Sequence, residues 1–135
     1  MKKLKVLLAD PRHKTVGAHS YFVPIGIGYI GSNLISQFGD QIELKLYVDA
    51  SEIFDILDTW QPDVIGVSNY IWNSDLSNFI CEYAKKINPN VLTVLGGPEF
   101  PAGTGAVRIE NNVQDATYDK CFEYLLDRPS VDYFA

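Results

Sequence analysis

Two short apolar runs in this sequence, residues 64–67 and 91–95, are each followed by residues that could bind a ligand. A small hydroxyl residue at one strand end can hydrogen-bond a buried heterocycle. Two consecutive glycines let the backbone approach a large planar group without a Cβ in the way. The residues that follow the two runs are, in order, Ser68, Asn69 and Tyr70, and then Gly96, Gly97, Pro98 and Glu99.

The segment between the two runs predicts a helix. Its apolar residues recur at helical spacing and would form one inner face. Asn73 or Ser74 can cap its start, and Asn88-Pro89 ends it. Strand, helix and strand of this length form a unit with parallel strands, whose carboxyl ends are the usual ligand position. The expected inner face consists of Leu76, Phe79, Ile80, Tyr83, Ala84 and Ile87.

The rest of the chain alternates strands and helices in the same way. Strands are expected at residues 4–9, 43–48 and 131–134, and helices at 24–38, 49–60 and 115–126. The second strand suits a sheet edge, Gly39 suits a helix end, and the stretch from Asp49 to Glu52 resembles a capping box. The last helix would turn Tyr118, Cys121, Phe122 and Leu125 inward. This alternation predicts an α/β fold, a three-layer αβα sandwich with a five-stranded parallel sheet in the Rossmann/flavodoxin-like order 2-1-3-4-5.

Composition narrows the functional classes. The 135 residues carry 11 basic and 17 acidic side chains, a net charge of -6, without a basic cluster. Nucleic acid is therefore not an expected partner, and no segment is long enough to cross a membrane. Cys81 and Cys121 are expected to be free thiols in a reducing, cytoplasmic environment.

Other α/β ligand sites fit less well. Gly26, Gly28 and Gly31 match the dinucleotide fingerprint, but a long loop, residues 10–23, separates them from the first strand. These glycines are expected on a helix, where they permit close packing or ligand approach. A receiver-type magnesium pocket would use Asp10 but needs acidic residues where Ser68 and Asn69 stand. A flavodoxin-type phosphate loop would need hydroxyls and glycines directly behind the first strand.

The spacing of the two ligand segments resembles that of cobalamin-binding domains. Ser68-x-Tyr70, then 25 residues, then Gly96-Gly97 is similar to their serine and glycine-pair pattern. With residues 24–30, 63–68 and 96–99, it looks like the N-terminal domain of cobalamin-dependent radical S-adenosylmethionine enzymes. The alternative that Gly96-Gly97-Pro98 is only a tight strand exit stays open.

The resemblance implies which residues bind the cofactor. Ser68 and Tyr70 would line a pocket for the nucleotide tail of cobalamin, Gly96 and Gly97 would form its floor, and the loops 10–23 and 99–114 its rim. Asn69, Pro98, Glu99 and Gly26 are the further expected cofactor-binding residues. If the glycine pair forms this floor, a side chain at Gly97 is expected to project into the space of the ligand.

The resemblance also implies a larger parent protein. Residues 1–135 would be one domain of it, joined to a C-terminal radical domain that binds S-adenosylmethionine and a 4Fe-4S cluster. The Cys-x-x-x-Cys-x-x-Cys motif for that cluster is absent here, so this domain alone would be non-catalytic. A degenerate, non-binding docking module of such an enzyme is the alternative function.

His13 departs from the cobalt-ligand motif of related proteins. Cobalamin methyltransferases and mutases carry Asp-x-His-x-x-Gly, whose histidine ligates cobalt. Here Asp10 precedes His13 by one residue too many, and Gly17 follows it by one too many. His13 is therefore expected to be a solvated loop residue, and no metal ligand is assigned.

Overall fold

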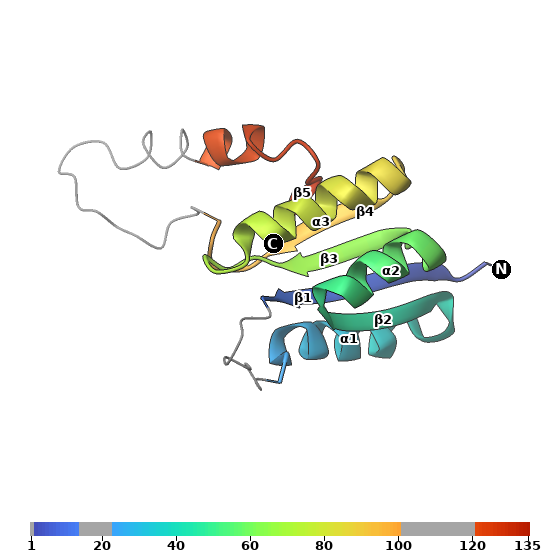
Figure 1. Ribbon diagram of the computed structural model, residues 1–135. Helices are drawn as coiled ribbons and strands as arrows, with labels where there is room; N and C mark the ends of the chain where they lie inside the picture. The colour runs from blue at the N-terminus through green and yellow to red at the C-terminus, as the bar shows by residue number, and fades with distance from the viewer. Residues whose placement is uncertain (1, 14–22, 101–120) are drawn as a thin grey trace.

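The computed structural model describes residues 2–13, 23–100 and 121–135, and these form one sheet of five strands (Figure 1). The spatial order is β2-β1-β3-β4-β5, and every neighbouring pair is parallel. The predicted fold and strand order are confirmed, including the edge position of the second strand. The strands are β1 (Leu4–Arg12), β2 (Ile42–Asp49), β3 (Val64–Ser68), β4 (Leu92–Gly96) and β5 (Tyr133–Phe134).

Helices cover both faces of this sheet and complete three layers. α2 (Ala50–Trp60) and α3 (Ser74–Ile87) lie on one face, and α1 (Ile25–Phe38) lies on the other (Figure 1). A short 3-10 turn, Gly39–Gln41, joins α1 to β2, and residues 121–126 are helical ahead of β5. The predicted long loops and the start of the last helix fall mostly on residues 14–22 and 101–120, outside the described residues.

The hydrophobic core is divided by the sheet into two clusters of unequal size. Alternate side chains of β1 enter each cluster, because successive residues of a strand point to opposite faces. Leu7 and Ala9 pack with residues of α2 and α3 in the larger cluster. Val6 and Leu8 pack beneath α1 in the smaller one, together with Ile27 and Ile42. Burial on both faces is typical of a parallel strand at the centre of such a fold.

β1 is longer than the sequence predicted. It continues past Ala9 to Arg12, with an irregularity in its pairing to β2 between these two residues. Ala9 pairs with Val67 on the other neighbouring strand, β3. The extension therefore carries Asp10 to the carboxyl end of β3.

Three residues were predicted to cap helix ends, and two of them do so as predicted. Gly39 ends α1 with a φ of 47°, and Asp49 caps α2 by accepting a hydrogen bond from Ser51 N at 2.9 Å. Both confirm the sequence signals. Asn73 occupies the N-cap position of α3, yet its side chain makes no capping hydrogen bond. The predicted N-cap position of Asn73 is therefore confirmed, but the side-chain hydrogen bond expected of a capping residue is not formed.

The inner face of α3 is shifted from the predicted one. Ser77, Ile80, Cys81 and Ala84 are buried, whereas Phe79 is 53% exposed. Small side chains bring this helix close to the sheet, so a face predicted from large apolar residues alone is displaced.

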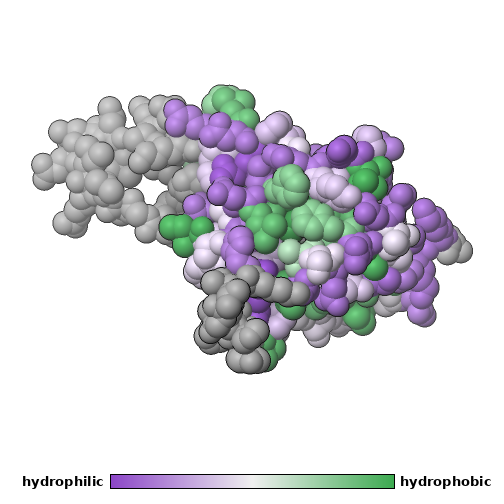
Figure 2. Space-filling model, viewed as in Figure 1, coloured by the Kyte–Doolittle hydropathy of each residue, from purple (hydrophilic) through white to green (hydrophobic). Residues whose placement is uncertain are grey.

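Phe79 instead lies between the two helices of this layer. Its ring meets Phe54 of α2 edge to face, with centroids 5.8 Å apart. Phe54 in turn meets Tyr83, with centroids 5.1 Å apart. Figure 2 views this layer from outside and shows apolar residues gathered over its middle, framed by hydrophilic ones.

The helical residues 121–126 also turn a different face inward. Phe122 is 60% exposed and Leu125 is 41% exposed, so their predicted inner positions are wrong. Tyr124 faces inward instead and packs edge to face against Phe134 at 5.3 Å and Phe100 at 5.6 Å. Tyr118 lies outside the described residues.

Both cysteines are free thiols, as predicted. Cys81 is buried, and burial is the largest cause that raises its pKa to about 12, followed by the charge of Asp132. No helix among the described residues has both the length and the apolar character needed to span a membrane.

Candidate functional site

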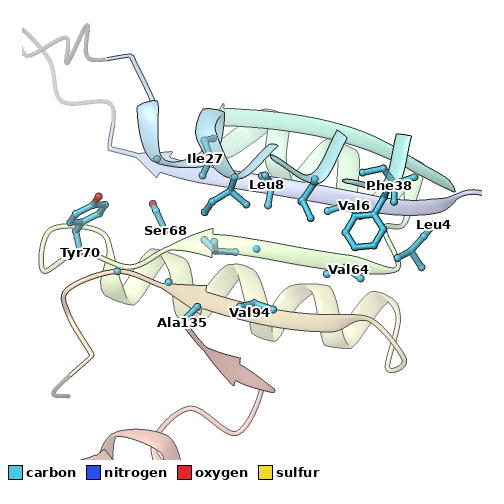
Figure 3. A pocket seen from close by; sticks show the side chains of 18 residues that line it. Leu4, Val6, Leu8, Ile27, Phe38, Val64, Ser68, Tyr70, Val94 and Ala135 are labelled. Atoms are coloured by element: carbon cyan, nitrogen blue, oxygen red, sulfur yellow. The ribbon is translucent and has the colours of Figure 1, made fainter. Parts of the chain in front are cut away.

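An elongated pocket of about 600 Å³ lies between α1 and the sheet (Figure 3). Ile27, Ile30 and Leu34 of α1 form one wall, and residues of β1, β3 and β4 form the other. One end, near Leu4 and Phe38, is apolar. The other end opens at the carboxyl ends of the strands, where the pocket is lined by Ser68, Tyr70, Gly96, Gly97 and Ala135.

Two glycines without side chains form part of the sheet wall of this pocket. Gly66 and Gly96 lie on neighbouring strands, where the partner of Gly66 is Val94 and the partner of Gly96 is Ser68. A Cβ at Gly66 would lie 2.9 Å from Leu8 Cδ2, and a Cβ at Gly96 would lie 3.6 Å from the Ala135 carbonyl oxygen. A side chain at Gly66 would therefore press against Leu8, which also lines the pocket, and a large side chain at Gly96 would enter the pocket.

Gly26 borders the pocket from the first turn of α1. A Cβ at Gly26 or at Gly28 would meet no heavy atom within 4 Å, whereas one at Gly31 would lie 3.1 Å from Leu44 Cδ2. The glycines of the stretch that matches the dinucleotide fingerprint therefore have two different structural roles. Gly31 permits close packing of α1 on β2, and Gly26 leaves the pocket mouth open.

Ser68 is the polar group at the carboxyl end of the pocket. Its Oγ donates a hydrogen bond to Asp10 Oδ1 at 2.6 Å and accepts one from Asn73 Nδ2 at 3.1 Å. Ser77 Oγ donates to the Ser68 carbonyl oxygen at 2.8 Å. Asp10 also forms an ion pair with Arg12 at 3.3 Å. Three elements, β1, β3 and α3, thus hold the hydroxyl in place.

Asn73 joins these elements through its buried amide. Its Nδ2 also donates to the Pro11 carbonyl oxygen at 3.2 Å, and its Oδ1 accepts from the backbone N–H of Tyr70 at 2.7 Å. The side chain is fully engaged here, which explains why it does not cap α3.

Gly97 lies against the backbone of Asn69. Its φ is +142°, a value that L side chains rarely adopt, and an added Cβ would lie 2.4 Å from the Asn69 carbonyl oxygen. The backbone N–H of Asn69 donates to Gly96 O at 2.7 Å, and that of Glu99 donates to Asn69 O at 3.2 Å. The expectation that a side chain at Gly97 would project into the ligand space is wrong, because it would collide with this turn.

The predicted site residues divide into two groups. Ser68, Tyr70, Gly96, Gly97 and Gly26 border the pocket. Asn69, Pro98 and Glu99 do not line it. The side chain of Asn69 is 1% exposed and points to Tyr124, whose hydroxyl accepts a hydrogen bond from Asn69 Nδ2 at 2.7 Å. Asn69 therefore links the end of β3 to the helical residues 121–126.

Sequence reasoning missed Asp10 and Asn73 as members of the site. The signal for Asp10 was available, because strand order 2-1-3 places the ends of β1 and β3 side by side. Asn73 carried only the signal of a helix cap. His13 is exposed just after β1, and the described residues contain no group of three or more metal-binding side chains. That His13 does not ligate cobalt stays a prediction.

Tyr70 borders the mouth of the pocket, and a second aromatic ring stacks on it. Tyr70 stacks on Trp72 with ring centroids 4.6 Å apart and an interplanar angle of 7°. Trp72 is 65% exposed, and Ile71 between them is 77% exposed. The mouth therefore presents flat apolar surface next to the polar group of Ser68.

Two sequence comparisons found similar proteins. A model of the B12 binding domain family matches residues 15–115. The cobalamin-dependent radical SAM methyltransferase TokK of Streptomyces tokunonensis is 40% identical over 45 residues, which is 33% of this chain and only 7% of that relative.

Two solved structures have a similar fold. A cobalamin-binding protein from Desulfitobacterium hafniense superimposes with a TM-score of 0.50 at 16% identity, covering 99% of this chain and 53% of that one. A putative pilus assembly-related protein from Burkholderia pseudomallei gives 0.52 at 11% identity, covering 97% and 75%. At these identities the likeness shows the fold alone.

Proposed function

This chain belongs to the B12 binding domain family, and from that premise we propose that it holds cobalamin with the nucleotide tail in the pocket between α1 and the sheet. The corrin ring would lie over the carboxyl ends of the strands, beside Ser68 and Tyr70. The observation that carries this proposal is the pocket itself, an apolar space of about 600 Å³ with one polar end.

The shape and chemistry of the pocket suit that tail. Small-molecule sites commonly measure about 300–1,000 Å³ and combine apolar walls with a few placed polar groups. A flat heterocyclic base would lie between the α1 wall, at Ile27 and Ile30, and the sheet wall at Gly66 and Gly96. The hydroxyl of Ser68 is the polar group that fixes its orientation. Because Gly66 and Gly96 have no side chains, the pocket is wide enough there for the ring of the base.

The protein would supply position and burial, while the cobalt supplies the methyl-carrying or redox chemistry when cobalamin is bound. We further propose that the domain serves a radical S-adenosylmethionine enzyme, such as a methyltransferase, in which a separate domain binds S-adenosylmethionine and the 4Fe-4S cluster. The support for this finer step is the resemblance of the sequence and the 45-residue match to TokK.

A degenerate domain that only docks to a partner is the competing function. A domain that had lost its cofactor would have no reason to keep the interior open, because filling an apolar cavity stabilises a fold. Gly96 still leaves space beside β4, because a Cβ there would make only ordinary contacts. The open pocket therefore favours the binding function.

Titration of the chain with hydroxocobalamin, followed by visible absorbance, tests the proposal. Gly96→Val is the informative variant, because its side chain would point to the α1 face of β4 and occupy the pocket. Leu92→Val is the matched control on the same strand and face, outside the pocket lining. We expect the parent and Leu92→Val to bind, and folded Gly96→Val to bind much more weakly. Equal binding by all three would place the tail elsewhere, and no binding by the parent would favour the docking function.

A further inference from the structure

The hydrogen-bond partners of Ser68 decide which kind of group it offers to a pocket occupant. Asp10 is ion-paired with Arg12, and an ionised carboxylate can only accept hydrogen bonds. Ser68 Oγ lies 2.6 Å from Asp10 Oδ1, a length typical of a hydroxyl donating to a carboxylate. The single hydroxyl hydrogen of Ser68 is therefore used on Asp10.

The amide of Asn73 has one orientation, which two backbone groups set. Its Oδ1 faces the N–H of Tyr70, and its Nδ2 faces the carbonyl oxygen of Pro11. Turning the amide over would place two donors together at one contact and two acceptors together at the other. Nδ2 therefore donates to Ser68 Oγ and takes up one of its two lone pairs.

One lone pair of Ser68 Oγ is left, so this hydroxyl faces the pocket as an acceptor. Resting on the function proposed above, we propose that the pocket takes the heterocyclic base of the cobalamin tail in its protonated form. The N–H of the base would donate to the lone pair of Ser68 Oγ that Asp10 and Asn73 leave free. Asp10 is then a positioning residue, which acts through Ser68.

This arrangement makes binding consume a proton. In free cobalamin near neutral pH, the base nitrogen is bound to cobalt and carries no hydrogen. On binding, the cobalt–nitrogen bond would break and an N–H bond would form with a proton from solvent, with no electron transferred. By linkage, the Kd for cobalamin should rise about tenfold for each pH unit in this range.

Other titratable groups near the polar end of the pocket could add their own pH dependence. α1 carries no charged residue, and its Tyr29 is 75% exposed. A second ligand without the base therefore serves as the reference, because it reports these protein groups alone. The residues concerned are Arg12 and His13 at the end of β1, Tyr70 after β3, Asp75 at the start of α3 and Glu99 after β4.

The test compares methylcobalamin with methylcobinamide, which lacks the nucleotide. A methyl group on cobalt replaces the water of hydroxocobalamin, which would itself titrate. We expect the affinity for methylcobalamin to fall about tenfold per pH unit from neutral to mildly alkaline pH, and the affinity for methylcobinamide to stay level. Equal slopes for the two ligands would overturn the inference.

Asp10→Asn reverses the polarity of Ser68. Its amide can donate to Ser68 Oγ, which frees the hydroxyl hydrogen for an unprotonated base. The pH slope for methylcobalamin should disappear, and the affinity at alkaline pH should exceed that of the parent. Asp75→Asn, at an exposed acid on α3, is the matched control and should keep the slope. A slope retained in folded Asp10→Asn would contradict the role of Asp10.

A measurement on the unaltered chain covers the case in which Asp10→Asn does not fold. Calorimetric titration in buffers of different ionisation enthalpy counts the protons taken up. We expect one for each methylcobalamin bound and none for methylcobinamide, and none for both ligands overturns the inference. Binding without proton uptake leaves the proposed function standing, whereas no binding of either corrinoid at any pH contradicts both.

Discussion

Gly97 and Asn69 approach so closely that a Cβ on Gly97 would lie 2.4 Å from the carbonyl oxygen of Asn69. The contact holds the turn after β4 against the end of β3, where the backbone N–H of Glu99 donates to that same oxygen. The second glycine of the pair is therefore needed for the backbone, and the first, Gly96, for the pocket. The tight-turn interpretation therefore describes Gly97, and the proposed cofactor binding concerns Gly96, which lines the pocket.

Gly97→Ala should destabilise the fold, whereas Gly96→Ala should not. The alanine at 97 would be held at a φ of +142° against a backbone oxygen, a strain on the order of 1–3 kcal/mol. At 96 the new Cβ makes ordinary contacts, so a change within about 0.5 kcal/mol is expected. Urea unfolding of the two variants measures both. Similar stabilities would mean that the turn adapts to a side chain.

Gly26→Leu should weaken cobalamin binding without loss of stability, and Gly28→Leu should leave binding unchanged. A Cβ at either position has open space, and leucine favours helix over glycine by up to about 1 kcal/mol. Of these two glycines, only Gly26 borders the pocket. We expect a loss of about tenfold or more in affinity for Gly26→Leu, since overpacking costs about 1–3 kcal/mol. Equal affinities for the two variants would exclude the mouth at Gly26 as the entry of the tail.

The order of strands and helices was predictable from the sequence because its signals agree with one another. Buried strands read as apolar runs, and residues such as Gly39 and Asp49 mark helix ends by known local chemistry. The pocket mouth was predictable for a related reason. Once β3 and β4 are parallel neighbours, Ser68 and Gly96 must meet at the same sheet edge.

The polar network behind the pocket was not predictable in the same way. Asn73 has the residue type and position of a helix cap, and only the tertiary structure brings Pro11 and Ser68 to its amide. The prediction of the inner face of α3 failed for a different reason. Ser77 and Cys81 are small, so apolar periodicity gives them little weight, yet small residues are what allow the helix to pack closely.

Asp132 should make the stability of the β5 edge depend on pH. Desolvation alone would raise the pKa of Asp132, but hydrogen bonds from Lys85 Nζ at 2.6 Å and from Thr93 outweigh it and hold the pKa below its usual value. A carboxylate with a lowered folded-state pKa contributes stability at neutral pH that is lost as pH falls through that pKa. Asp132→Asn should therefore be less stable than the parent at neutral pH, and the two should converge in acid.

Thermal unfolding across pH measures this convergence. Lys85→Met removes the ammonium partner of Asp132. In that background, Asp132→Asn should lower the stability at neutral pH by less than it does in the parent. Asp40→Asn is the control, because its ion pair with Lys3 is 3.5 Å long and solvent-exposed. A constant gap between Asp132→Asn and the parent at all pH values would show that the carboxylate does not carry the pH dependence.

Tyr124→Phe should destabilise the fold through Asn69. The hydroxyl of Tyr124 accepts from Asn69 Nδ2 at 2.7 Å, and Asn69 Oδ1 is already buried without a hydrogen-bond partner. Removing the hydroxyl would leave both ends of a buried amide unsatisfied, which costs about 1–3 kcal/mol. The phenylalanine ring would keep the packing against Phe134 and Phe100, so this cost isolates the hydrogen bond.

Tyr133→Phe makes the same change on a tyrosine that is 60% exposed and should alter the free energy of unfolding by less than about 0.5 kcal/mol. Equal effects of the two substitutions in urea unfolding would show that Asn69 does not depend on Tyr124.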